Sequence, residues 1–333
     1  MVLALSGTRA DAQAPGDEAA LQSSGREPAR QRLPAVLRAA AGVVLFVLVA
    51  VAVARSWSDV RETVGRIAPY ELLASEALVL FGLLLSALTW RIAVRELDSS
   101  VHVAAASKIY LLGQLGKYLP GSLWAVAAQT ALAKRSGVPP SRGASAGIVA
   151  IGINIVTGFT LGALLVPSLL SGGVWRSLLV VAVVALCAVA LSPVVLTRLV
   201  NAGLKLVRSP LLERQVSWRG MLSASGLSFT SWLSYGLSVW VLAVGVGATP
   251  LEALPLCLGG VALAMTLGVL VVIVPSGIGV REAIIVGALS PVLSSSDALA
   301  VALVARLVFT LADLLAALAV LPIRIERPTP APR

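Results

Sequence analysis

The chain has 333 residues, of which 58% are hydrophobic and only 13% are charged, and its mean hydropathy is +0.93. A soluble domain of this length cannot bury so much apolar surface, so the composition excludes a soluble globular protein and predicts a polytopic α-helical membrane protein. The formal net charge of +10 lies in loops, as the positive-inside rule requires, and no basic–aromatic pattern accompanies it, so we expect no nucleic-acid partner.

Side chains that could ligate a metal are scarce. Cys187 and Cys257 both lie within apolar segments, and the single histidine, His102, lies at the edge of a loop. This usage gives no basis for a disulfide framework or a metal site. No P-loop, nucleophile elbow or zinc motif occurs in the sequence either, so we expect no cofactor and no enzymatic activity.

The N-terminal region divides into a polar tail and an apolar anchor. Residues 1–34 are rich in Ala, Pro, Gly and Arg, which predicts a disordered cytoplasmic tail. The apolar run at 35–54 ends in a triplet that resembles a signal-peptide cleavage site, but the run is longer than a usual signal core and follows a long polar lead. We therefore interpret it as a retained anchor. A single transmembrane domain over 35–322 and a short cytoplasmic tail over 323–333 complete the predicted organisation.

Eight apolar segments stand out, at 35–54, 72–94, 103–133, 143–165, 177–196, 221–246, 253–292 and 298–321. The third and the seventh are interrupted by Pro and Gly, and neither half of the third can cross a hydrocarbon core about 30 Å thick. We expect an all-α membrane helix bundle of about six full spans plus two re-entrant helical hairpins, arranged as an inverted repeat. Because 253–274 is long enough to cross, a bundle of about eight spans is the alternative.

Basic residues indicate the orientation of the chain. Arginines lie before the first segment and after the last one: Arg26, Arg30, Arg32, Arg324, Arg327 and Arg333. Because Lys and Arg are enriched in cytoplasmic loops, both termini are predicted to be cytoplasmic. We expect a multi-pass protein of the plasma membrane.

The first broken segment reads GQLGKYLPGSLW at 113–124. Pro120 and Gly121 are predicted structural breaks, which form the turn between two half-helices. Lys117, with Gln114 and Tyr118 beside it, could complete an anion-binding site at this turn. The alternative for Lys117 is that its ammonium group snorkels to the cytoplasmic headgroups.

The second broken segment reads PSGIGVRE at 275–282. Pro275, Gly277 and Gly279 interrupt the helix, and Arg281 and Glu282 place ionisable groups at membrane depth, which is typical of a functional site. A helix that starts here directs free N–H groups into the break and favours an anion, and the guanidinium of Arg281 suits phosphate. The alternative is that Arg281 and Glu282 bind other residues and hold the hairpin in place.

The last segment carries two charges within its apolar run. Arg306 and Asp313 are seven residues apart, so two helical turns place them on one face. Charges at this depth need partners or water, which predicts either an Arg306–Asp313 pair or a pair between Arg306 and Glu282. A role in substrate binding and a purely structural interhelical pair are both consistent with this pattern.

Four serines lie close to one face of the 221–246 segment: Ser228, Ser231, Ser234 and Ser238. Such serines could line a polar path across the membrane. More often they allow close packing and hydrogen bonding between helices, and we favour that interpretation.

The two breaks also carry a family resemblance. The GQLGKYLPGSLW run, the basic AKRSGV run at 133–138, the PSGIGVRE run and Arg306 together resemble the transmembrane-region family of lysylphosphatidylglycerol synthases, a flippase-like family, over about residues 35 to 322. The resemblance implies that the protein moves lipids between leaflets. The aminoacyl-transfer domain of fused family members has no counterpart here, so lysylphosphatidylglycerol synthesis is not expected.

Two functions follow from these observations. The first is a flippase-like lipid transporter whose partner is the anionic headgroup of a phospholipid or of a polyprenyl-phosphate-linked lipid, bound by Arg281 and Lys117. The alternative is a non-transporting membrane partner that docks a cytoplasmic glycosyltransferase or lipid-modifying enzyme through its basic loops. An intramembrane enzyme would need a deep acid or base, for which Glu282 and Asp313 are the candidates.

Overall fold

The computed structural model describes residues 57–119, 124–165, 174–206, 211, 216–271 and 277–325. The predicted anchor at 35–54, the N-terminal tail and most of the C-terminal tail lie outside these residues, as do the predicted breaks Pro120, Gly121 and Pro275. Every regular element in the described part of the chain is helical. This confirms the all-α class that the apolar periodicity predicts.

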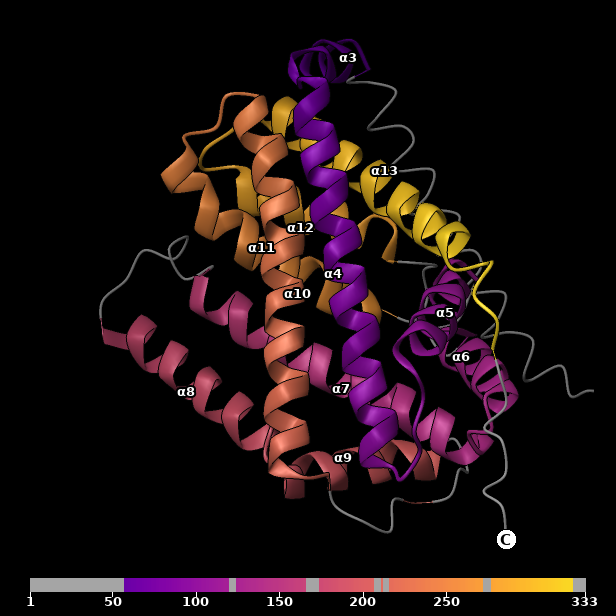
Figure 1. Cartoon of the computed structure of the whole chain (residues 1–333). Coiled ribbons are helices and arrows are strands. Elements are labelled where there is room, and N and C mark those ends of the chain that lie inside the picture. The colour runs from indigo at the N-terminus through magenta and orange to yellow at the C-terminus, as the bar shows by residue number, and fades with distance from the viewer. Residues whose placement is uncertain are drawn as a thin grey trace, which may run out of the picture.

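Five of the described helices are long and apolar enough to cross a membrane. They are α4 (Pro69–Glu96), α7 (Pro140–Leu165), α10 (Trp218–Gly245), α11 (Pro250–Leu270) and α13 (Ser295–Ala319). The most extensive packing joins α4 and α10, which run side by side along the front of the molecule (Figure 1). Behind this pair, α7 and α11 pack against each other, and α13 crosses α4 diagonally.

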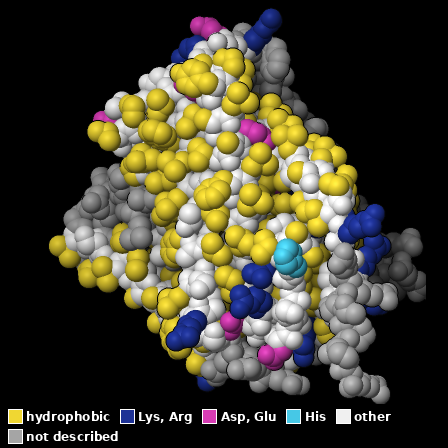
Figure 2. Space-filling view, viewed as in Figure 1, with side chains coloured by type: hydrophobic (Ala, Val, Ile, Leu, Met, Phe, Trp, Pro, Cys, Tyr) yellow, Lys and Arg dark blue, Asp and Glu magenta, His cyan; other side chains and the backbone are white. Residues whose placement is uncertain are grey.

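The outer surface has the character of a membrane-facing band. Figure 2 shows hydrophobic side chains over most of the face formed by α4, α10 and α13, with Lys and Arg gathered toward its lower end. Exposed Leu73, Phe81 and Leu84 on α4, and Leu307 and Leu311 on α13, contribute to this surface. In water such a face would favour aggregation, whereas in lipid it is the expected exterior of a helix bundle.

The predicted span at 177–196 is divided between two helices that meet at a bend. The chain forms α8 (Val174–Ala190) and α9 (Pro193–Leu206), and the two apolar parts of these helices meet at an angle of 79°. The bend falls at Ser192–Pro193, where proline removes a backbone donor and disfavours helical geometry in the preceding residue. Counting this bent pair, the described chain has up to six spans.

The first broken segment forms two short helices that pack against each other. They are α5 (Val103–Gln114) and α6 (Trp124–Arg135), and the 3₁₀ helix η1 (Leu115–Tyr118) follows α5 directly. Each α-helix has 12 residues and is about 18 Å long, too short for a hydrocarbon core of about 30 Å. Close packing needs Gly113, where an added Cβ would lie 2.4 Å from Cγ of Gln129. The arrangement is that of the predicted hairpin.

The second broken segment is less symmetrical. Its first half, α11, has 21 residues, which is enough to span, whereas α12 (Val280–Leu289) has only 10. A helix of 10 residues is about 15 Å long and cannot cross the membrane. The eight-span alternative requires 278–292 to form a full span, and it therefore does not hold. The inverted-repeat relationship between the two halves stays a prediction.

Of the four serines predicted on one face of α10, Ser228 and Ser234 bond to neighbouring helices. The Ser228 hydroxyl donates to Asn154 Oδ1 at 2.8 Å and lies 2.7 Å from the Thr157 hydroxyl, both on α7. Ser234 donates to the carbonyl oxygen of Leu78 on α4 at 2.7 Å, and the other two serines donate to carbonyls of their own helix. These bonds satisfy the hydroxyl groups within the protein, as expected for helix–helix contacts in a membrane.

Candidate functional site

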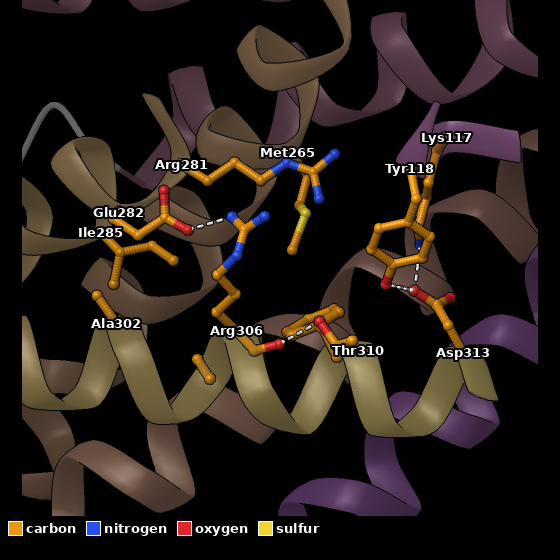
Figure 3. Close-up of a pocket in the computed structure, with 12 residues that line it drawn as sticks. Lys117, Tyr118, Met265, Arg281, Glu282, Ile285, Ala302, Arg306, Thr310 and Asp313 are labelled. Carbon is orange, nitrogen blue, oxygen red and sulfur yellow. Dashed lines mark hydrogen bonds and ion pairs between the residues drawn. The ribbon is translucent and has the colours of Figure 1, made fainter. Parts of the chain in front are cut away.

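Three elements from distant parts of the sequence meet around a charged cleft. The turn of the first hairpin contributes Lys117 and Tyr118, the start of α12 contributes Arg281 and Glu282, and α13 forms the floor (Figure 3). The cleft contains about 390 Å³ of empty space. Its lining includes nearly all of the ionisable residues that the sequence singles out within the apolar segments.

The floor of the cleft is one face of α13. Arg306, Thr310 and Asp313 follow one another at helical spacing and project from this face, as Figure 3 shows. The Thr310 hydroxyl donates to the carbonyl oxygen of Arg306 at 2.9 Å and is thereby satisfied within the helix. Because Arg306 and Asp313 both project from this face of α13, the prediction that they share one face is confirmed. The two side chains do not bind each other.

Arg306 pairs with Glu282, which is one of the two pairings that the sequence allows. The carboxylate of Glu282 is 5% exposed, accepts an Nη1–H bond from Arg306 and accepts the backbone N–H of Gly279 at 2.6 Å. Gly279 is the residue that precedes α12 and has φ +83°, a conformation that favours glycine. Glu282 thus binds the backbone at the start of α12 and is ion-paired with Arg306.

Asp313 binds the turn of the first hairpin. One of its carboxylate oxygens accepts the Tyr118 hydroxyl at 2.6 Å and the Lys117 ammonium at 2.6 Å. Asp313 is 4% exposed, and the Lys117 ammonium also lies 5.5 Å from the centre of the Tyr118 ring. Lys117 is therefore ion-paired within the protein, with its side chain 21% exposed.

Arg281 differs from the other charged residues that line the cleft because it lacks an ion-pair partner. In the described part of the chain it forms no ion pair, and its Nε is buried without a hydrogen-bond partner. Its side chain lies against α11 at Gly268, where an added Cβ would be 2.7 Å from this Nε. Figure 3 shows the guanidinium group beyond Met265, on the side of the cleft that faces Lys117 and Tyr118. A partly buried guanidinium without an ion-pair partner is a strong site for an anion.

A wider chamber adjoins the cleft and contains about 1040 Å³ of empty space. It shares four lining residues with the cleft: Lys117, Met265, Arg281 and Phe309. Its other walls come mainly from α4, α6, α7 and α10 and are largely apolar. The two spaces therefore meet at Lys117 and Arg281, the two cations that the sequence assigns to the breaks.

The remaining predicted residue, Gln114, lies in the chamber rather than in the cleft. Its amide donates to the Tyr110 hydroxyl at 3.4 Å. Sequence reasoning missed Gln129, which is 4% exposed and lines the same chamber from α6. It also missed Glu76 on α4, whose two carboxylate oxygens are buried without a hydrogen-bond partner. Polar residues within the apolar segments were the available signal for both.

Other kinds of site find no support in the described residues. Within those ranges no group of three His, Cys, Asp or Glu side chains could hold a metal ion. Cys187 and Cys257 are free and buried. The charged cleft and the chamber beside it are therefore the features from which we infer function.

Comparison with known protein families gives a match that covers both broken segments. No curated protein matches this chain. The family described as lysylphosphatidylglycerol synthase TM region matches residues 38–317, which include both breaks, nearly all of α13 and all of the residues that line the cleft. This match covers most of the chain, and the protein belongs to the family of lysylphosphatidylglycerol synthase transmembrane regions.

Proposed function

We propose that this membrane protein moves a lipid with an anionic headgroup between the two leaflets, and that Arg281 binds the headgroup. The observation that carries the proposal is the unpaired guanidinium of Arg281 at the meeting point of two broken membrane elements. Membership of a family related to lipid handling supports it.

The charge distribution in the cleft favours an anionic ligand. Three cations line the cleft with two acids, and both acids are already ion-paired, Glu282 with Arg306 and Asp313 with Lys117. Arg281 is the cation that remains. An unpaired charge in a low-dielectric site is unfavourable by several kcal/mol, and this penalty falls when a phosphate binds. The charges that line the cleft therefore favour the binding of an anion at Arg281.

The shape and lining of the adjoining space favour a lipid over a small solute. The chamber is largely apolar, while its border with the cleft carries Lys117 and Arg281. A ligand with a charged end and an apolar end would meet both environments at once. Both a phospholipid and a polyprenyl-phosphate-linked lipid have this character.

The proposed location is the plasma membrane, with both termini in the cytoplasm. The C-terminal end of α4 carries Arg91 and Arg95, and the first turn of α7 carries Arg142. The lower end of the molecule, where α4 ends, is the end at which basic side chains gather (Figure 2). The positive-inside rule assigns that end to the cytoplasm.

The alternative function is a docking partner for a cytoplasmic enzyme, which needs free basic side chains. Several of the basic residues at the proposed cytoplasmic end bind within the chain instead. Arg91 donates to the carbonyl oxygen of Val101 at 2.9 Å, and Arg142 donates to that of Asp98 at 2.7 Å. Lys108 donates to two carbonyls after α13 at 2.6 Å each. We therefore favour transport over docking and over catalysis.

The test is leaflet exchange in proteoliposomes, with fluorescent phosphatidylglycerol and a fluorescent polyprenyl-phosphate lipid measured separately. The wild-type protein is compared with Arg281→Ala and with Arg61→Ala, a matched control in which an exposed arginine of α3 (Trp57–Arg66) is removed. We expect protein-dependent exchange that Arg281→Ala abolishes and Arg61→Ala preserves. Absence of exchange for both lipids, with folded wild-type protein, would favour the docking function.

A further inference from the structure

Helix α9 lies crosswise to α4 and α10 and contributes no described residue to the cleft or the chamber. Its first half meets the end of α8 at 79°, and Figure 1 shows α9 along the lower end of the molecule, at the level where α4 ends. The next helix, α10, starts at this level too, because the N–H of Ser217 donates to the carboxylate of Glu96, the last residue of α4, at 2.6 Å. Helix α9 therefore connects its neighbours at the end of the bundle.

The start of α10 marks the boundary of the membrane at this end. Trp218 is 62% exposed, and Arg219 beside it is exposed as well. Tryptophan side chains gather where the hydrocarbon meets the headgroups, because the ring is apolar and its N–H is polar. Leu222, one turn further along α10, is exposed and suits the hydrocarbon. The headgroup layer is therefore at the level of Trp218, which is also the level of α9.

The two faces of α9 differ in chemistry. The inward face packs on α7, where a Cβ added at Gly152 would lie 3.4 Å from Cδ1 of the buried Leu196. Arg198 and Lys205 are seven residues apart and are both exposed on the opposite face. A helix with one packed apolar face and one basic face is typical of helices that lie in the plane of the headgroups.

The cations of this surface are not used within the protein. Across the described residues, Arg198, Lys205 and Arg219 take part in no hydrogen bond or ion pair, in contrast to Arg91 and Arg142. The sequence from 99 to 212 contains nine Lys or Arg residues and no Asp or Glu, so no acid on α9 or close to it in sequence before it can neutralise them. Their counter-charge must come from outside the chain.

We infer that α9 is an in-plane helix of the headgroup layer, and that Arg198 and Lys205 bind the anionic headgroups of the surrounding leaflet. Arg219 adds a third cation at the same end of the molecule. The phosphates that these residues bind belong to the bulk lipid around the protein and not to a lipid at Arg281. The inference therefore goes beyond the function proposed above and does not depend on it.

An anionic leaflet fits this surface better than an acidic protein does. Val194 and Leu199 are exposed on α9 together with the cations, at 41% and 54%. At a membrane surface the apolar side chains and the stems of Arg and Lys reach the start of the acyl chains, while the charged ends stay among the phosphates. A soluble acidic partner would satisfy the cations alone.

A single label on α9 tests both its depth and its lipid neighbours. Leu199→Cys is introduced into full-length protein together with Cys187→Ala and Cys257→Ala, is labelled with bimane, and is reconstituted in phosphatidylcholine vesicles that contain some phosphatidylglycerol. Lipids brominated at different positions of the acyl chain quench the label according to its depth. We expect the strongest quenching from bromine near the headgroup. The matched control is Leu307→Cys on the exposed face of α13, which should be quenched best by bromine deeper in the chain.

The headgroup preference is measured with the same label. Brominated phosphatidylglycerol and brominated phosphatidylcholine are compared at equal mole fraction, and we expect phosphatidylglycerol to be enriched beside α9. Arg198→Gln combined with Lys205→Gln should lower this enrichment about fivefold, because each basic side chain at an anionic surface contributes about that factor. The conservative pair Arg198→Lys and Lys205→Arg should retain it, as should Arg61→Gln at the other end of the molecule. At about 1 M salt, where the Debye length is about 3 Å, the enrichment should disappear.

Each result has a defined meaning. Strongest quenching by bromine at the chain ends would place α9 within a broken span, and quenching by aqueous iodide without quenching by any brominated lipid would leave its surface to a soluble acidic partner. Either result would overturn the in-plane position. Equal quenching by the two headgroups, or an unchanged preference in the double Gln variant, would overturn the role of the two cations. Arg281→Gln should leave the enrichment intact, so failure of the proposed transport and failure of this inference are distinguishable.

Discussion

Both broken membrane elements bring charged side chains to the cleft, but the two elements differ in whether these charges are paired. The first hairpin contributes Lys117 and Tyr118, and both bind Asp313 on α13. The second break contributes Glu282, which is also fully engaged, and Arg281, which is not. Pairing converts a buried charge into a structural contact, whereas an unpaired charge keeps its capacity to bind a ligand. The difference indicates that the first hairpin holds the site together and the second supplies the binding group.

Loss of the contact between Asp313 and the first hairpin should have the largest effect on the stability of the protein. Asp313→Asn leaves Lys117, whose side chain is 21% exposed, without its counter-ion, and the loss of this partly buried pair should cost up to about 3–5 kcal/mol. We expect a marked fall in the apparent melting temperature, measured by the loss of monodisperse protein on heating in detergent.

A double variant tests the cause of that loss. Lys117→Met removes the cation, so Asp313→Asn combined with Lys117→Met should be more stable than Asp313→Asn alone. Tyr118→Phe, which removes only a neutral donor, should cost about 1 kcal/mol. A double variant no more stable than the single one would mean that the ion pair is not what Asp313 contributes.

Substitution of Arg281 at the second break should have the opposite effect on the melting temperature. Arg281→Gln removes an unpaired buried charge, so we expect an unchanged or higher melting temperature together with a fall of about 10- to 100-fold in affinity for an anionic lipid. Thermal stability and lipid competition are measured on the same preparation. If Arg281→Gln destabilises the protein as much as Asp313→Asn does, Arg281 has a structural partner and the contrast between the breaks is lost.

The packing of Arg281 against α11 gives an intermediate test. An added Cβ at Gly268 would lie 2.7 Å from Arg281 Nε, so Gly268→Ala must displace the guanidinium group. We expect a loss in lipid affinity smaller than that of Arg281→Gln, with about 1–3 kcal/mol of strain in the native state. Gly287→Ala on α12 is the matched control, because nothing lies within 4 Å of the added Cβ there. Equal lipid affinity in both variants would show that Arg281 does not need its present position.

Much of this arrangement could be predicted from sequence, and the exceptions have physical reasons. Hydropathy and break residues predict the short first hairpin, and helical spacing predicts the shared face of Arg306 and Asp313. Which acid binds which cation could not be predicted, because α13 meets η1 and α12 only in the folded bundle. The bend at Pro193 was missed because the apolar run continues across it. Gln129 was missed because it lies in an otherwise apolar half-helix.

Glu76 provides the smallest expected effect. Its carboxylate oxygens are buried without a partner in the described chain, as is the Nε of Arg281, but Glu76 does not line the cleft or the chamber. Because a neutral amide is less costly to bury than an unpaired carboxylate, Glu76→Gln should leave stability unchanged or raise it by about 1 kcal/mol. Lipid affinity should not change. A fall in melting temperature comparable to that of Asp313→Asn would instead show that Glu76 is paired in the membrane. Among the described residues, Arg281 would then be the intramembrane charge with a buried atom that lacks a partner.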